Sequence, residues 1–197
     1  MNIKLLTYDP NAKSRIQCNV EDILRTVGLP EETLERLAAS GYYKAPASKG
    51  HHLDGPGGLA LHSMHVTNRL ITISLAFDIP WERKEGPVLV GLLHDLVKTQ
   101  CYEKMPFGYE HREPDYPGHG FASVCIAEDL GFTLKKDEKL AIIHHMGAFG
   151  LDSKGLRWLD AATDIRRGSW PAAVMATHFA DWYASRIDDE EVDRELF

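Results

Sequence analysis

Cysteine is scarce in this sequence, and the few cysteines are widely separated. The three are Cys18, Cys101 and Cys125. They lie too far apart for the short spacing of a cysteine zinc site, and they argue against the disulfide framework of a small secreted domain. We therefore expect reduced thiols in a cytoplasmic protein.

Long apolar runs and an excess of positive charge are also missing. No run approaches the ~20 residues that cross a bilayer, and the start MNIKLLTYDP lacks the basic and apolar regions of a signal peptide. The net charge of −7 argues against a long nucleic-acid track, but it is compatible with a small phosphorylated substrate beside local cations. We expect no membrane partner, and nucleic acid is the less favoured partner. The oligomeric state stays open.

Alternation of polar and apolar residues, which marks half-buried strands, is almost absent. Apolar residues instead recur at helical spacing between helix start and stop signals, so the sequence predicts an all-α fold. Residues 1–46 would form a short extended N-terminal arm and helices that pack on a core domain over 47–197. The expected helices cover residues 19–28, 30–41, 59–77, 85–99, 119–131, 138–146 and 169–187. The expected loops cover residues 47–58, 101–118 and 148–168.

Histidine, by contrast, is abundant, with ten residues. The segment GLLHDLVKT places His94 and Asp95 in an apolar run, where an ionised Asp is rarely buried unless it is paired or binds a metal. One histidine on an apolar face is usually structural, but here several predicted helices carry such residues. The others are His62, His65, His119, His144, His145, His178 and Asp181. This distribution predicts a site built in the core of a helical bundle from facing helices.

Imidazole and carboxylate ligands together suit one or two divalent transition metal ions, such as Fe, Mn, Ni, Co or Zn. Two ions about 3.5–4 Å apart bind both oxygens of an in-line displacement at phosphorus. Lys98 lies one helical turn beyond His94, on the same side. It would neutralise charge on a phosphoryl group as a catalytic residue, and the alternative is a lysine at the surface.

The order of these residues and their flanks resemble the HD-domain superfamily of metal-dependent phosphohydrolases. The similar segments are GGLALHSMHV, GLLHDLVK, GHGFAS, AIIHHMG and THFADWYASR, so the resemblance runs from about His51 to Arg186. HHLDGPGG is similar to a segment of HD domains associated with exoribonucleases and with plasmid or phage functions. Val97 replaces a glycine that is usual in the family. The glycine-rich signature of cyclic-dinucleotide phosphodiesterases is missing, which disfavours that substrate.

The resemblance implies an HD-domain helical bundle over 47–197 and a role for each matching residue. The first metal would be held by His62, His94, Asp95 and Asp181. A second would be bridged by Asp95 and held by His119 and His144, with His145 as a further ligand or a phosphate contact. A metal-bound hydroxide would then attack a nucleotide or another small phosphoester. His178 is expected to orient Asp181. The candidates for substrate contact are Lys98, His51, His52, His65, Arg166 and Arg167.

Three other functions stay open at this stage. The first is a nuclease-associated HD domain that processes nucleic-acid ends, and the second is a non-catalytic sensor module that binds a metal or a ligand. The third is a di-iron oxygenase in the same fold. The adjacent lysine and the complete ligand set favour the phosphohydrolase over the sensor module, and the acidic balance of the chain counts against the nuclease.

Overall fold

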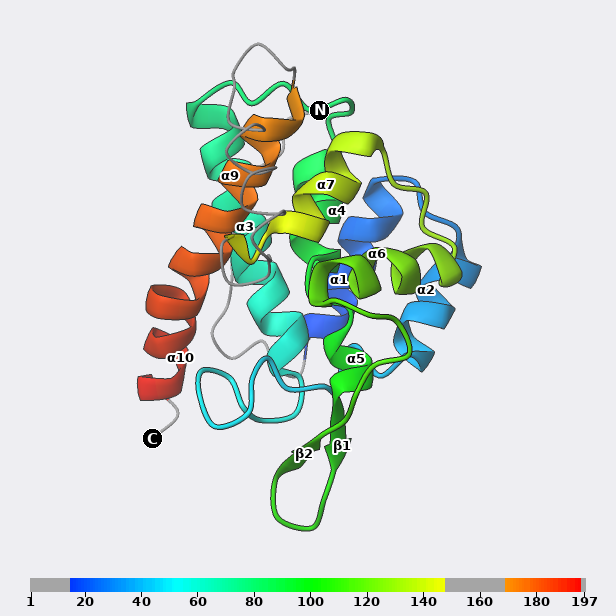
Figure 1. The fold of residues 1–197 in the computed structure, drawn as a ribbon, viewed down its shortest axis with the longest axis vertical. Helices are drawn as coiled ribbons and strands as arrows, with labels where there is room; N and C mark the ends of the chain where they lie inside the picture. The colour runs from blue at the N-terminus through cyan, green and yellow to red at the C-terminus, as the bar shows by residue number, and fades with distance from the viewer. Residues whose placement is uncertain (1–14, 148–168, 196–197) are drawn as a thin grey trace.

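The computed structural model describes residues 15–147 and 169–195, which are mostly helical, as the sequence predicts. The helices are α1 (Ile16–Thr26), α2 (Glu31–Ala39), α3 (Gly58–Ala76), α4 (Gly86–Leu93), α5 (Lys98–Cys101), α6 (His119–Asp129), α7 (Lys136–His144), α9 (Ser169–Tyr183), the π-helical turn η4 (Ala184–Asp188) and α10 (Asp189–Glu195) (Figure 1). The predicted arm lies outside the described residues except at its end, where α1 begins earlier than the expected residue 19. The predicted loop 148–168 also lies outside them.

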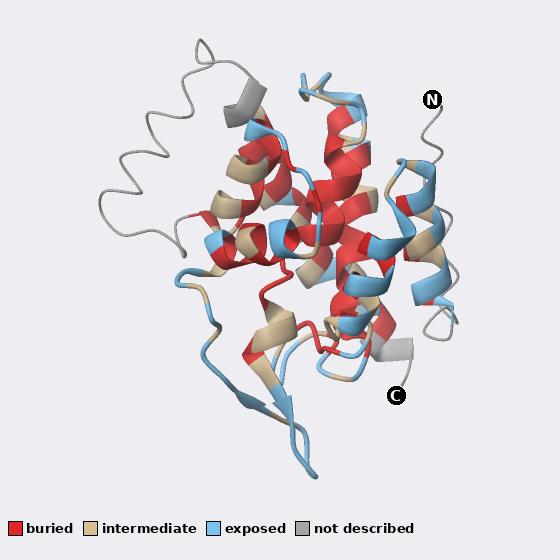
Figure 2. Ribbon diagram, turned by 90° about the vertical axis from the view of Figure 1, so that its right-hand side faces the viewer, coloured by how far each residue is buried: buried red, intermediate tan, exposed pale blue. Residues whose placement is uncertain are grey.

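The core is built around α3 and α4. Every residue of α4 and most residues of α3 are buried, as expected for helices that are apolar on all sides. Helix α9 packs against α3 and α7, and α6 packs against α7. Figure 2 shows the buried residues gathered on these central helices. This packing brings the histidine-bearing segments of the sequence to one side of α3.

Glycine allows the central helices to approach closely. A β-carbon on Gly91 of α4 would lie 2.5 Å from the Oγ1 atom of Thr67 and 2.6 Å from its Cα atom. A β-carbon on Gly120 of α6 would overlap the backbone carbonyls of Ile142 and Ile143 in α7. Both glycines lie within one helical turn of a predicted metal ligand. The close approach therefore sets how near the histidines of facing helices come to one another.

Substitution of Gly91 by valine is expected to force α3 and α4 apart. The added side chain would overlap the backbone of Thr67, and overpacking of this kind costs about 1–3 kcal/mol of unfolding free energy. Thermal or urea unfolding measures this loss. The matched control is Gly55→Ala, because a β-carbon there meets nothing within 4 Å. Equal stability of the Gly91 variant and the wild type would show that the helices do not depend on this contact.

The predicted helix over 85–99 is interrupted in the structure. Helix α4 ends at Leu93 and α5 begins at Lys98, and the turn between them is closed by i→i+3 hydrogen bonds such as that from the Lys98 N–H to the Asp95 carbonyl (2.9 Å). The Val97 N–H donates to the Ser123 hydroxyl of α6 at 3.1 Å. This tertiary contact is invisible to a helical pattern. It holds His94 and Asp95 in a tight turn rather than along a regular helix.

The expected loop over 101–118 contains a small antiparallel hairpin. Strand β1 (Tyr102–Lys104) pairs with β2 (Tyr109–His111), with Tyr102 opposite His111. The Met105 N–H donates to the Gly108 carbonyl at 3.0 Å, and Gly108 has a φ of 89°, a conformation that glycine adopts without strain. The prolines of this segment obscured the short strands. The hairpin is exposed and projects away from the helices (Figures 1 and 2).

Candidate metal centre

Six histidine and aspartate side chains from five segments converge beside α3. We call this group the His/Asp cluster. Its members are His62 of α3, His94 and Asp95 of the α4–α5 turn, His119 of α6, His145 after α7, and Asp181 of α9. Their ligand atoms form overlapping groups of three in which all atoms lie within 4.8 Å of one another. Metal ligands in proteins gather in this way.

Asp95 lies at the middle of the cluster, and its two oxygens face different histidines. Its Oδ1 atom lies 2.6 Å from Nε2 of His119 and 3.4 Å from Nε2 of His145. Its Oδ2 atom lies 3.5 Å from Nε2 of His62 and 3.4 Å from Nε2 of His94. The carboxylate therefore lies between two overlapping sets of donor atoms, because a ligand atom of His145 is also within 4.8 Å of those of His94 and Asp181.

Asp181 completes the set on the Oδ2 side of Asp95. Its Oδ1 atom lies 3.2 Å from Nε2 of His62 and 3.7 Å from Nε2 of His94. The same two Nε2 atoms are 3.3 Å apart. Two imidazoles and two carboxylates thus meet on one side, and two imidazoles share the other oxygen of Asp95.

The outer nitrogens of two cluster histidines are tied to backbone carbonyls. The Nδ1–H of His94 donates to the Gly91 carbonyl at 2.9 Å, and the Nδ1–H of His145 donates to the Ile142 carbonyl at 2.6 Å. A carbonyl only accepts, so each ring carries a proton on Nδ1, and only its neutral form presents an unprotonated Nε2 to the centre. Nε2 of His145 is buried and has no hydrogen-bond partner among the described residues. A buried lone pair of this kind fits a bound cation.

Asp189 is a member of the site that the sequence reading missed. It is fully buried, and its two oxygens accept hydrogen bonds from Nδ1 of His62 at 2.7 Å and Nδ1 of His65 at 2.6 Å. His65 is therefore buried against Asp189 and was expected instead to contact substrate. Asp189 lies in an acidic run at 188–191, a composition typical of a solvated helix end. The histidine pair at 62 and 65 was the only signal that a buried carboxylate lay nearby.

The π-helical turn η4 explains how Asp181 and Asp189 face the same side of α3. An α-helix turns about 100° per residue, so side chains eight residues apart would diverge by about 80°. The wider i→i+5 turn at 184–188 contains more residues per turn and reduces this difference. Both aspartates then reach His62, one at each ring nitrogen.

The charges of the cluster stabilise one another. Burial opposes ionisation of Asp95 and Asp181, but nearby cations outweigh it and hold the pKa of each carboxyl well below its usual value: Lys98 and His94 for Asp95, and His62 and His94 for Asp181. Burial likewise opposes the charged imidazole of His94, but the carboxylates raise its pKa to about 9. The carboxylates therefore stay ionised at neutral pH and attract positive charge into the core.

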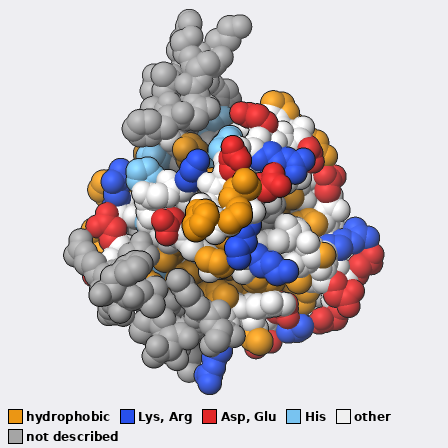
Figure 3. Space-filling view, turned by 90° about the horizontal axis from the view of Figure 1, so that it is seen from below, with side chains coloured by type: hydrophobic (Ala, Val, Ile, Leu, Met, Phe, Trp, Pro, Cys, Tyr) orange, Lys and Arg blue, Asp and Glu red, His pale blue; other side chains and the backbone are white. Residues whose placement is uncertain are grey.

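A cavity of about 290 Å³ opens beside the cluster. Lys98 lines it, with its ammonium group 2.5 Å from Oδ2 of Asp95. Its side chain is 14% exposed, and the carboxylate outweighs burial and raises its pKa. Trp182 and Arg186 of the C-terminal helices also line this cavity. Histidine side chains reach the surface beside charged residues on the face shown in Figure 3.

The structure places His145, and not His144, in the cluster. Adjacent side chains point about 100° apart around a helix, so only one of the pair reaches Asp95. His144 belongs to none of the ligand groups. Burial, and then the neighbouring His145, lower its pKa to about 4. His145 therefore occupies the place in the cluster that was expected for His144.

Alanine substitutions of this adjacent pair are expected to differ in effect. His145→Ala removes a cluster nitrogen and should lower the affinity for Mn²⁺ or Co²⁺ by at least about tenfold. His144→Ala is the matched control and should keep the wild-type affinity. Isothermal titration of the metal into each variant measures both values. A larger loss with His144→Ala would contradict the arrangement.

The other residues expected at the site have different positions. The Nδ1–H of His178 donates to the His145 carbonyl at 2.7 Å, and no His178–Asp181 hydrogen bond occurs among the described residues. His178 therefore holds the end of α7 in place. It was expected instead to orient Asp181. His52 lies near the cluster, 3.6 Å from Asp189. Arg166 and Arg167 lie outside the described residues.

Comparisons with protein-family models, with curated proteins and with solved structures found no match for this chain. None of the helices in the part of the chain that the structure describes combines the length and apolar character needed to cross a bilayer. Identification of the site therefore depends on the contacts within the chain itself.

Proposed function

We propose that this chain is a metal-dependent phosphohydrolase of the HD type that acts on a nucleotide or another small phosphoester. One observation carries the proposal. The two oxygens of Asp95 face different pairs of histidine Nε2 atoms, and Asp181 contacts the first pair. This matches the ordered His/Asp pattern that the sequence shares with HD domains. It also supports a centre for one or two divalent transition ions, such as Fe, Mn, Ni, Co or Zn.

The residues present fit such ions. His62, His94, Asp95 and Asp181 would hold the first ion, and His119, His145 and the second oxygen of Asp95 would hold another. Bound divalent ions lower the pKa of coordinated water and neutralise the charge of phosphoryl oxygens. The buried Nε2 of His145, which has no hydrogen-bond partner in the described part of the chain, is explained by this assignment.

The residues of the chain would bind and orient the phosphoryl group. Lys98 places an ammonium group at the cavity wall, where it attracts a phosphate as a point charge. Asp95 holds that ammonium group in place. A cavity of about 290 Å³ admits a phosphate group and part of its ester, which favours a small substrate.

Substitution of Lys98 by methionine tests its expected catalytic role. Loss of one charge-assisted hydrogen bond to the phosphoryl group is worth about 1.5 kcal/mol, so kcat/KM should fall roughly tenfold. Metal content should stay unchanged, because the ammonium group is not a ligand. Metal analysis and phosphate release on the same preparation measure both. Unchanged kcat/KM would restrict Lys98 to pairing with Asp95.

The proposal itself is tested by metal analysis of the purified protein, followed by a phosphate-release screen with Mn²⁺, Fe²⁺, Ni²⁺ and Co²⁺. We expect bound metal and phosphate release from nucleoside monophosphates or other small phosphoesters. The screen includes short RNA and DNA, whose cleavage would favour a nuclease-associated role. Metal binding with no turnover of any phosphoester would contradict the phosphohydrolase and favour a sensor module.

A further inference from the structure

A second, larger cavity adjoins the metal centre. We propose that it binds the hydroxyl-bearing sugar of the substrate, so that the substrate is a ribose-type phosphate ester such as a ribonucleotide. This inference rests on the proposed function, because it takes the phosphoryl group of the same molecule to lie at the His/Asp cluster. The second cavity measures about 460 Å³.

The two cavities share part of their walls. His52, Ser185 and Arg186 line both of them. A substrate whose phosphoryl group contacts Lys98 would therefore extend past these residues into the larger space. A cavity of this size holds more than a phosphate group. It would receive the part of the substrate that does not react.

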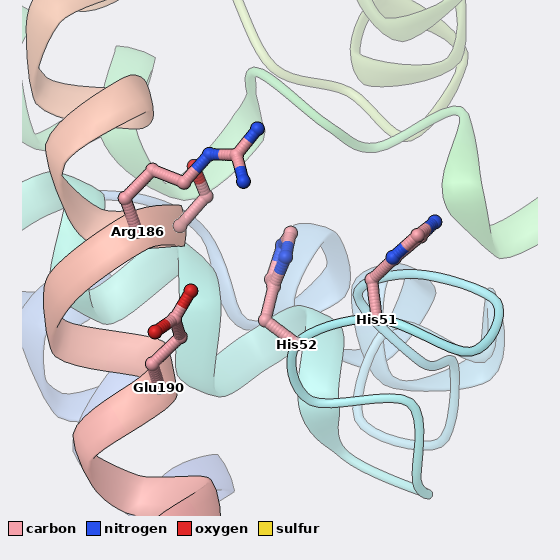
Figure 4. Close-up of a pocket in the computed structure, with 5 residues that line it drawn as sticks. His51, His52, Arg186 and Glu190 are labelled. Carbon is pink, nitrogen blue, oxygen red and sulfur yellow. The ribbon is translucent and has the colours of Figure 1, made fainter.

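The larger cavity has polar walls on two sides. His51 and His52 come from the loop before α3, and Arg186 and Glu190 come from η4 and α10. Figure 4 shows His51 and His52 on a loop opposite the helix that carries Arg186 and Glu190. The guanidinium group of Arg186 forms no ion pair with any residue that the structure describes. Its N–H groups are hydrogen-bond donors at the wall of the cavity.

The mixture of donors and acceptors favours hydroxyl groups as the occupant. An apolar group would offer no hydrogen bonds to the polar side chains of the walls, and a second phosphate would be repelled by the Glu190 carboxylate. Hydroxyls both donate and accept, so they match Glu190 and Arg186 together. A carboxylate that accepts from a ribose hydroxyl is a recurrent way to recognise this sugar.

The position of Glu190 strengthens the assignment. Its neighbour Asp189 is fully buried and bonds the ring of His62, while Glu190 lines the open cavity. Adjacent residues of one helix thus contact the metal centre and the sugar cavity. This fixes the separation between the phosphoryl group and the hydroxyls that the site accepts.

The test compares the binding of AMP and 2′-deoxy-AMP to the full chain by isothermal titration. Titrations are made in EDTA, and again with Mn²⁺ using non-cleavable phosphonate analogues of both nucleotides. Wild-type protein should bind the ribonucleotide about tenfold more tightly, which corresponds to one charge-assisted hydrogen bond. Glu190→Gln should reduce the preference to below about threefold. The exposed neighbour gives the control Glu191→Gln, which should keep it.

Equal binding of both nucleotides to the wild type would overturn the inference, as would no binding of AMP under either condition. An unchanged preference in Glu190→Gln would overturn it as well. Its failure is distinguishable from failure of the proposed function, because binding is measured without turnover. Ribose preference without phosphate release would support the sugar cavity and contradict the phosphohydrolase. Phosphate release with equal use of both sugars would support the phosphohydrolase and contradict the sugar cavity.

Discussion

Substitution of Asp95 by asparagine is expected to remove bound metal and to lower phosphate release by more than about 100-fold. Removal of a residue that only supports a metal ligand costs up to about 100-fold, and loss of a ligand itself should cost more. The amide keeps the shape of the carboxylate but loses its charge and one ligand oxygen. Both histidine sets depend on this side chain, because each of its oxygens faces one of them. Metal analysis and the phosphate-release assay on the same preparation measure the two effects.

The control for this variant is Asp22→Asn on α1, where the side chain is 75% exposed. It removes the same charge from the chain and should leave metal content and activity unchanged. Circular dichroism shows whether Asp95→Asn keeps its helices, since it leaves Lys98 without its carboxylate. A folded Asp95 variant with full metal content would contradict the candidate centre.

Substitution of Asp189 by alanine is expected to weaken metal binding by about 100-fold, although this residue would not touch the ion. Its carboxylate fixes the ring of His62 through Nδ1 and keeps Nε2 directed at the centre. Without it, His62 loses both its orientation and a negative neighbour. Titration of Co²⁺ or Mn²⁺ into the metal-free variant measures the affinity.

The adjacent aspartate offers a matched control for this prediction. Asp188 forms an ion pair with Arg69 on the outer side of α3, and it forms no hydrogen bond or ion pair with the His/Asp cluster among the described residues. Asp188→Asn should therefore keep the wild-type metal affinity. Comparable losses of metal affinity in the two variants would contradict the prediction. They would mean that the C-terminal helix supports the centre through its packing and not through the hydrogen bond from His62 to Asp189.

Much of the fold was predictable because helices leave a local signature. The apolar residues of α3 and α4 recur over many turns, and capping and glycine signals bound the helices. The interruption after Leu93 was not predictable, because the turn depends on the bond between Val97 and Ser123 of another helix. The hairpin was missed because three-residue strands carry too short an alternating pattern.

The candidate site was predictable in part. The segment HD at 94–95 stands out because polar residues are costly inside an apolar helix, and the structure brings both residues into the cluster. The choice between His144 and His145 was not predictable, since it depends on the rotation of α7 about its axis. Asp189 was missed for a similar reason, because only the π-helical turn carries it inward.

The neighbouring acids at 188 and 189 attach the C-terminal helix to α3 from two sides, one through Arg69 and the other through His62 and His65. Since His62 also faces the other ligands, an ion that orders its ring orders the inner attachment as well. Ligands that bind only the native state stabilise that state by mass action. Occupancy of the centre and docking of the C-terminal helix are thus thermodynamically linked.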